Sequence, residues 1–331
     1  MSTVMLVLVV LLSVAFDFIN GFHDTANSIA TSVSTRVLTP RTATMMSAGL
    51  NFVGALVSAK VAETIASGIV NEVLPSYVIA AALCGAIVWN LFTWYIALPS
   101  SSSHALIGSL VGAAVVQTWS LKTINWINIL DKVIIPLFTS PLIGIVIGFL
   151  FMKLLYFFLR NAKQENVKHW FSKLQIASAA LMAYSHGSND AQKTMGIITM
   201  ALVSGGVISA DTGVPLWVKI VCATAMALGT SMGGWRIIKT VGMNMIKLQP
   251  VEGFAAETSA AAVIQVMTAI GAPVSTTHVI SSSIMGVGSA KRLSAVNWST
   301  AKSIVTAWFV TFPVTILLGM GFTFLFRLFP V

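Results

Sequence analysis

Residues 20–28 read NGFHDTANS and lie in the middle of a long apolar stretch. A related motif, HGSNDAQKT, occupies residues 186–194, and a shift of 166 positions aligns the glycine and the aspartate of the two motifs. Glycine and ionisable side chains are costly in a segment that crosses lipid, unless the segment lines a cavity or binds a ligand. The pattern therefore predicts two membrane helices that are interrupted at Gly21 and Gly187 to form an ion and substrate site.

A second pair of motifs repeats in the same order. LPSSSSHA at 98–105 is echoed by APVSTTHV at 272–279 with a shift of 174 positions. Two motifs that recur in order at nearly the same offset indicate an internal duplication. We therefore expect a first repeat at 1–159, a polar linker at 160–173 and a second repeat at 174–331.

The composition places the chain in a membrane. Of its 331 residues, 56% are hydrophobic and 9% are charged, whereas a soluble domain carries about 25% charged residues. The expected fold class is an all-α polytopic membrane protein with two inverted repeats, broken helices and re-entrant helical hairpins. About ten apolar runs that reach the length of a membrane span are expected at 4–33, 43–59, 77–98, 104–118, 133–157, 174–203, 216–235, 258–272, 277–290 and 300–326.

Charged loops indicate that the two repeats have opposite orientations. Lys and Arg mark cytoplasmic loops, and the linker holds four of them. The loop expected at 34–42 has two arginines, but its counterpart at 204–215 has only an aspartate; the loop at 60–75 is mostly acidic, and its counterpart at 236–252 is basic. Equivalent loops then face opposite sides, with the linker in the cytoplasm and both termini outside. Inverted repeats are typical of secondary transporters that hold their substrate near the midplane.

The Ser/Thr motifs are predicted to bind an anion. Each follows a proline, Pro99 or Pro273, that ends a helix, and serine is a preferred residue at the start of the next one. We expect hairpins at 77–118 and 258–290, whose second helices direct N–H groups and hydroxyls at a small tetrahedral oxyanion. The residues predicted to contact it are Ser101, Ser102, Ser103, Ser275, Thr276 and Thr277.

The Asn-Asp motifs are predicted to bind a cation. Ionisable residues at membrane depth are functional candidates, and carboxylate and carboxamide oxygens are hard ligands that suit Na⁺. Proton coupling through one of the aspartates is the alternative. The predicted cation ligands are Asp24, Asn27, Asn189 and Asp190, with Na⁺ at the two aspartates, and Asn27 and Gln192 are also assigned to the oxyanion.

Other polar residues are secondary candidates. Glu63, Glu257 and Lys193 are predicted to act in coupling or gating, although a simple salt bridge to Asp190 is an equal alternative for Lys193. Four of the five histidines lie inside the repeated motifs. We expect each of these imidazoles to hydrogen-bond backbone groups beside an interrupted helix rather than to bind a ligand.

At these motifs the chain resembles the PiT family of inorganic phosphate transporters, particularly its short bacterial and archaeal members. The matching stretches cover nearly the whole chain and read FDFINGFHDTANSIA, AKVAETI, LPSSSSHALIGSLVG, AYSHGSNDAQKTMGI, GTSMGGWRIIKTVG, GFAAETSAA and PVSTTHVISSSIMGVG. The resemblance implies import of inorganic phosphate across the cell membrane by symport with Na⁺ or H⁺. It also implies cation and phosphate roles for the Asn-Asp motifs and the Ser/Thr tips, and a membrane homodimer is plausible for the family. One departure is Asn51, which stands where some animal members have an acid.

Several alternatives share these residues. A permease for sulfate or for a metal–phosphate complex would use the same physics, and a passive anion channel would lack the cation dependence. An intramembrane hydrolase fits less well because a nucleophile and its base need occur only once, whereas the polar motifs are duplicated, so we expect no enzyme activity and no cofactor beyond the coupling ion. The formal net charge of +9 reflects the loops and does not predict nucleic-acid binding.

Overall fold

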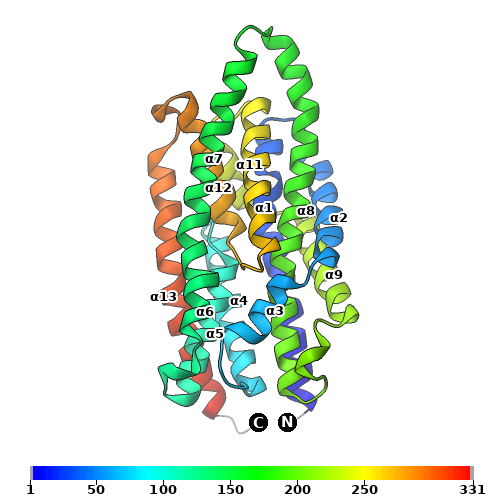
Figure 1. Cartoon of the computed structure of the whole chain (residues 1–331), viewed down its shortest axis with the longest axis vertical. Helices are drawn as coiled ribbons and strands as arrows, with labels where there is room; N and C mark the ends of the chain where they lie inside the picture. The colour runs from blue at the N-terminus through cyan, green and yellow to red at the C-terminus, as the bar shows by residue number, and fades with distance from the viewer. Residues whose placement is uncertain (1–2, 329–331) are drawn as a thin grey trace.

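The structure, a computed structural model, describes residues 3–328, which form a bundle of α-helices (Figure 1). Ten of these helices coincide with the ten apolar runs, which confirms an all-α architecture. The helices are α1 (Thr3–Ser34), α2 (Pro40–Val57), α3 (Lys60–Gly68), α4 (Ser76–Tyr95), α5 (Ser102–Thr118), α6 (Trp126–Ile129), α7 (Ile135–Leu159), α8 (Gln164–Ser204), α9 (Leu216–Met232), α10 (Trp235–Lys239), α11 (Pro250–Ala269), α12 (Thr276–Lys291) and α13 (Trp298–Leu328).

Fewer helices have the length and hydropathy of a membrane span than there are apolar runs. Within residues 3–328, four helical segments are long and apolar enough to span, namely α1, α4, the continuous stretch Trp126–Leu159 and α13. Two bent pairs, α2 with α3 and α9 with α10, bring the number to six. Four of the ten apolar runs lie in the expected hairpins at 77–118 and 258–290, and they form the helix pairs α4–α5 and α11–α12.

The two hairpins enter the bundle from opposite ends. α4 and α5 lie in the half that holds the N-terminal end of α1 and the C-terminal end of α13, while α11 and α12 lie in the other half (Figure 1). Their turns approach each other at mid-height, where the rings of His104 and His278 are 4.9 Å apart. Each hairpin also packs against the other half of the chain, α5 on α13 and α12 on α7.

The helices break at different places from those predicted. α1 and α8 continue without interruption through Gly21 and Gly187, so the predicted breaks there were wrong. The bends lie instead between α2 and α3, at 64°, and between α9 and α10, at 61°. The second bend uses Gly233, whose φ of +74° suits a residue without a side chain.

Gly21 and Gly187 serve close helix packing. A Cβ atom on Gly21 would overlap the carbonyl oxygen of Met226 in α9, and one on Gly187 would overlap that of Asn51 in α2. Small residues allow membrane helices to approach at backbone distance. The equivalent crossings α1–α9 and α2–α8 therefore join the two halves of the chain in the same way.

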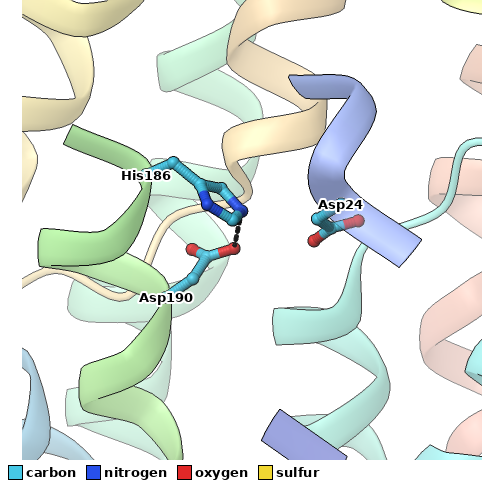
Figure 2. Close-up of side chains that lie close together, drawn as sticks. All are labelled: Asp24, His186 and Asp190. Carbon is cyan, nitrogen blue, oxygen red and sulfur yellow. Dashed lines mark ion pairs between the residues drawn. The ribbon is translucent and has the colours of Figure 1, made fainter. Parts of the chain in front are cut away.

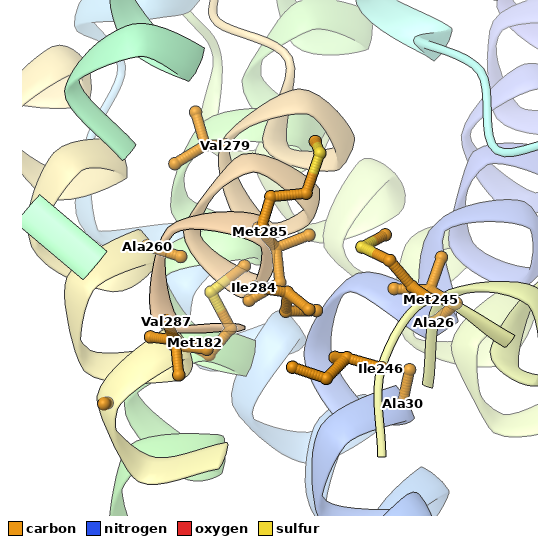
Figure 3. Close-up of a cluster of buried hydrophobic side chains, with 14 of the residues drawn as sticks. Ala26, Ala30, Met182, Met245, Ile246, Ala260, Val279, Ile284, Met285 and Val287 are labelled. Atoms are coloured by element: carbon orange, nitrogen blue, oxygen red, sulfur yellow. The ribbon is translucent and has the colours of Figure 1, made fainter. Parts of the chain in front are cut away.

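Apolar side chains fill the end of the bundle opposite the chain ends. Met182 of α8, Met285 of α12 and Ile246, which follows α10, belong to one buried cluster with Ala26 and Ala30 of α1 (Figure 3). The loops expected at 60–75 and 236–252 were partly wrong, since they contain α3, α10 and a π-helical turn at Thr240–Asn244. Most of the linker is helical as well, because α8 begins at Gln164.

Candidate functional site

Asp24 lies at the centre of the bundle, where both hairpin turns reach α1. Its Oδ1 is 2.6 Å from His23 Nδ1, and its Oδ2 accepts a hydrogen bond of 3.2 Å from the Ser102 hydroxyl of α5. The Thr277 hydroxyl of α12 approaches Oδ1 at 3.5 Å. The carboxylate is only 2% exposed, so a hydroxyl from each hairpin faces the same buried acid.

Asp190 of α8 has a matching environment. Its Oδ2 accepts a 3.0 Å hydrogen bond from the Thr276 hydroxyl and lies 3.2 Å from His186 Nε2. Its Oδ1 forms an ion pair with Lys193. Both predicted aspartates therefore contact the first turn of a hairpin helix, and the predicted salt bridge of Lys193 is present.

Lys193 also connects the two hairpin turns. Its ammonium is buried and donates to the Ser103 hydroxyl of α5 and, at 2.9 Å, to the carbonyl oxygen of Val274 in the other hairpin. Ser103 donates to the same carbonyl at 3.0 Å. A buried ammonium with three oxygen partners is well compensated, so Lys193 both neutralises Asp190 and fixes the distance between the turns.

The two predicted carboxamides keep an oxygen available. Asn27 donates to Thr277 at 2.9 Å and to Thr276 at 3.2 Å, and Asn189 donates to Thr268 at 2.8 Å. The Oδ1 atoms of both asparagines are buried and have no hydrogen-bond partner among residues 3–328. Buried polar atoms are usually satisfied, and a carbonyl oxygen without a donor is suited to a cation.

The geometry brings together a possible set of ion ligands. One ligand atom each from Asp24, His186 and Asp190 lies within 4.8 Å of the others, and these side chains project from α1 and α8 toward one another (Figure 2). With the carboxamide and hydroxyl oxygens described above, the set is dominated by hard oxygen donors, which fit Na⁺. The imidazole nitrogen additionally suits a divalent transition metal.

The starts of α5 and α12 confirm the predicted caps. The Ser101 hydroxyl accepts a 3.2 Å bond from His104 N, and the Ser275 hydroxyl accepts a 3.3 Å bond from His278 N. Pro99 was expected to end the preceding helix at Leu98, but α4 ends three residues earlier, at Tyr95. A turn follows in which Ala97 has a φ of +57°. Two helix N-termini, each with unsatisfied first-turn N–H groups, thus face the same central point.

Three predicted site residues lie outside this centre. The Gln192 carboxamide caps α3, accepting from Val61 N at 2.9 Å, and donates to the Ser188 carbonyl. Glu257 is buried and accepts hydrogen bonds from Thr31 and Ser178. Glu63 is exposed on α3.

The histidines do not bond the backbone as expected. His23 lies between Asp24 and, at 3.1 Å, the Thr93 hydroxyl, and His186 lies between Asp190 and the Asn51 oxygen at 3.0 Å. His278 stacks on Trp308 with ring centroids 4.2 Å apart. The imidazoles of the Asn-Asp motifs therefore orient the two carboxylates, because α1 and α8 are continuous and offer no free backbone there.

A polar vestibule opens beside α3 and α6. Its volume is about 810 Å³, and it reaches the turn between α11 and α12 at Ala269–Gly271. Lys60 donates to Ala269 O at 3.0 Å, and Lys132 donates to Ile270 O at 3.0 Å. Glu63 lines this vestibule and does not lie at the centre.

Comparison with known proteins assigns the chain to a family. The model of the phosphate transporter family matches residues 20–319. The chain belongs to the phosphate transporter family. Relatives include probable low-affinity inorganic phosphate transporters of Bacillus subtilis, 48% identical over 96% of this chain and 95% of the relative, and of Rhizobium meliloti, 47% identical over 94% of each.

A solved structure supports the fold. It is named "The sodium-dependent phosphate transporter", matches with a TM-score of 0.89 and covers 99% of this chain and 100% of that one, at 24% sequence identity. The match confirms the expected fold class. Membership of a family of membrane transporters likewise confirms the expectation of a multi-pass transporter that is not an enzyme.

Some members of the site were not assigned from the sequence. The Thr93 hydroxyl lies 3.1 Å from Nε2 of His23. Asn51 contacts Nδ1 of His186 through its Oδ1 and donates from its Nδ2 to the Thr230 hydroxyl at 3.0 Å. Thr93 lies outside the quoted motifs, Asn51 was noted only as a departure from the family pattern, and Thr230 lies in the stretch GTSMGGWRIIKTVG, so none of the three was assigned a contact at the site.

Proposed function

We propose that this member of the phosphate transporter family imports inorganic phosphate by symport with a cation, with Na⁺ favoured over H⁺. The observation that carries the proposal is the buried meeting of Asp24 and Asp190 with hydroxyls from two opposing helix N-termini. The names of the relatives supply the substrate class, and the name of the solved structure favours sodium.

Charge explains why a cation must accompany the anion. With neutral imidazoles, the ionised centre holds two carboxylates, Asp24 and Asp190, and one ammonium, Lys193. This sum is negative before any ligand enters, and a buried unpaired charge costs several kcal/mol. Phosphate adds further negative charge, so its binding requires cations on the carboxylate of Asp24 and on the Oδ1 atoms of Asn27 and Asn189, which have no hydrogen-bond partner within residues 3–328.

The hydroxyls and first-turn N–H groups supply the phosphate side of the site. Ser102, Ser103, Thr276 and Thr277 bring four hydroxyls to the centre, and the two helix dipoles favour an anion there. Ser101 and Ser275 act as caps that hold these turns in shape. Asn27, which bonds both threonines, links the phosphate ligands to the cation ligands.

We assign secondary roles to the remaining predicted residues. Gln192 acts indirectly by fixing the start of α3, Glu63 guides ions in the vestibule, and Glu257 contributes to coupling from beyond the centre. We further propose repeats at 1–159 and 174–331, a cytoplasmic linker at 160–173, both termini outside, and a homodimer in the cell membrane.

A second candidate is transport of a metal–phosphate complex. The cluster of Asp24, His186 and Asp190 favours it, because two carboxylates and an imidazole suit a divalent metal better than they suit Na⁺ alone. In that case Mg²⁺ or Mn²⁺ would be required in the phosphate solution and would enter with the anion.

Phosphate uptake into proteoliposomes tests both candidates. We expect radiolabelled phosphate to accumulate when an inward Na⁺ gradient is imposed, without divalent metal and with equal pH on both sides. If a pH gradient alone drives uptake, the coupling ion is H⁺ instead of Na⁺. A strict requirement for a divalent metal would favour transport of the metal–phosphate complex. Uptake that ignores every cation gradient would overturn symport, and efficient competition by sulfate would overturn phosphate specificity.

A further inference from the structure

A polar stripe runs along one face of α1 on both sides of Asp24. Its members recur at intervals of three or four residues and are all buried; they are Ser13, Asp17, Asn20, Asp24, Asn27 and Thr31. Such spacing places side chains on one helical face. The stripe therefore passes through the central site and extends toward the N-terminal end of α1.

The two ends of this stripe differ in their hydrogen bonding. Beyond the centre, Thr31 donates to Glu257. Toward the N-terminal end, both carboxylate oxygens of Asp17, both polar atoms of Asn20 and the Ser13 hydroxyl have no hydrogen-bond partner anywhere in residues 3–328. Unsatisfied buried polar groups are rare and costly, so three on one helix face point to a ligand.

Asp17 is the key group of this segment. Its side chain is fully buried, and the Thr194 hydroxyl of α8 and the Cys222 thiol of α9 approach it as donors but do not reach full hydrogen-bond geometry. The charged groups that act on it are Asp190 and Lys193, both on α8, and Lys193 is already paired with Asp190. Asp17 is thus a buried acid without a counter-ion of its own.

We propose that Asp17, Asn20 and Thr194 form a binding site for Na⁺, separate from the ligands around Asp24. The three side chains offer carboxylate, carboxamide and hydroxyl oxygens, the donor types that a small hard cation prefers. Asp17 lies seven residues, or about 10 Å, along α1 from Asp24. A cation at Asp17 would therefore lie next to the central cluster along α1, on the side of the bundle where the vestibule opens.

The site rests on the proposed cation coupling and adds a location for one coupling ion. Direct Na⁺ binding tests it, measured with ²²Na⁺ on purified protein in nanodiscs without phosphate. We expect Asp17→Asn to bind one Na⁺ fewer per chain than the wild type, while Asp211→Asn, the same change at an exposed acid, binds as the wild type does. Thr194→Val keeps the carboxylate of Asp17 and is expected to weaken the affinity for the same Na⁺ several-fold. This second variant tests the site even if Asp17→Asn does not fold.

The outcomes separate this site from the general function. Unchanged Na⁺ stoichiometry and affinity in folded Asp17→Asn would overturn the site, and a simultaneous change in the pH dependence of uptake would assign a proton to Asp17 instead. If wild-type protein shows no sodium-driven phosphate uptake but Asp17→Asn still loses a bound Na⁺, the symport proposal fails and the site stands.

Discussion

At the scale of single residues, the candidate site contains two aspartates, each held by neighbours on its own helix and by a hydroxyl from a distant hairpin helix. His23 and Ser102 hold Asp24, whereas His186, Thr276 and Lys193 hold Asp190. These contacts orient carboxylate oxygens toward a common centre. Under the proposed symport, we expect the charge of each aspartate, rather than its volume, to determine how strongly a cation binds.

Replacing either aspartate by its isosteric amide tests this dependence on charge. We expect Asp24→Asn and Asp190→Asn each to lower sodium-driven phosphate uptake at least tenfold, because the amide removes a full negative charge that would otherwise attract the cation in a buried site. A tenfold change in affinity corresponds to about 1.4 kcal/mol of binding free energy. Initial uptake rates in proteoliposomes at matched protein density provide the measurement. Asp211→Asn serves as the control, and near-normal transport by either site variant would remove that aspartate from the mechanism.

At the scale of helices, the sequence predicted the repeated motifs and the capped hairpins but misplaced the breaks. The caps at Ser101 and Ser275 depend on local chemistry, a proline followed by serine, which a sequence displays directly. Gly21 has two uses in an apolar helix, an interruption or a close contact, and only the carbonyl of Met226 opposite it decides between them. The contact of Gln192 with the start of α3 was not foreseen for the same reason, since that helix begins far away in sequence.

The contact at Gly21 gives a prediction about stability. We expect Gly21→Ala to cost roughly 1–3 kcal/mol, because the added methyl group meets rigid backbone of α9, and to lower the apparent melting temperature by several degrees. Gly49→Ala is the matched control: Gly49 also lies in a helix, but a Cβ atom there meets nothing within 4 Å. Thermal unfolding in detergent, followed by intrinsic fluorescence, should separate the two variants, and equal melting temperatures would contradict the close-packing role.

At the scale of the whole molecule, the burial of the centre implies that the protein must change shape to transport. Asp24 and Asp190 are almost completely covered, while the vestibule opens on the side of α3 and α6. On the other side Arg236 of α10 donates to Tyr95 O at 2.8 Å and stacks on Trp94. Lys60 and Arg236 hold the ends of α11 and α4 in equivalent ways, so the same kind of contact is present on both sides of the buried centre.

Directional transport requires a definite orientation in the membrane, and labelling can establish it. In a background with Cys84→Ala and Cys222→Ala, we introduce Ala162→Cys between α7 and α8 or Asp211→Cys between α8 and α9, both exposed positions. α8 separates these positions and runs the length of the bundle (Figure 1). Since basic residues surround position 162 and favour the cytoplasm, an impermeant maleimide should label Asp211→Cys in intact cells and Ala162→Cys only after permeabilisation. The reverse pattern would place the termini inside and open the vestibule to the cytoplasm; labelling of both in intact cells would contradict a membrane-spanning α8.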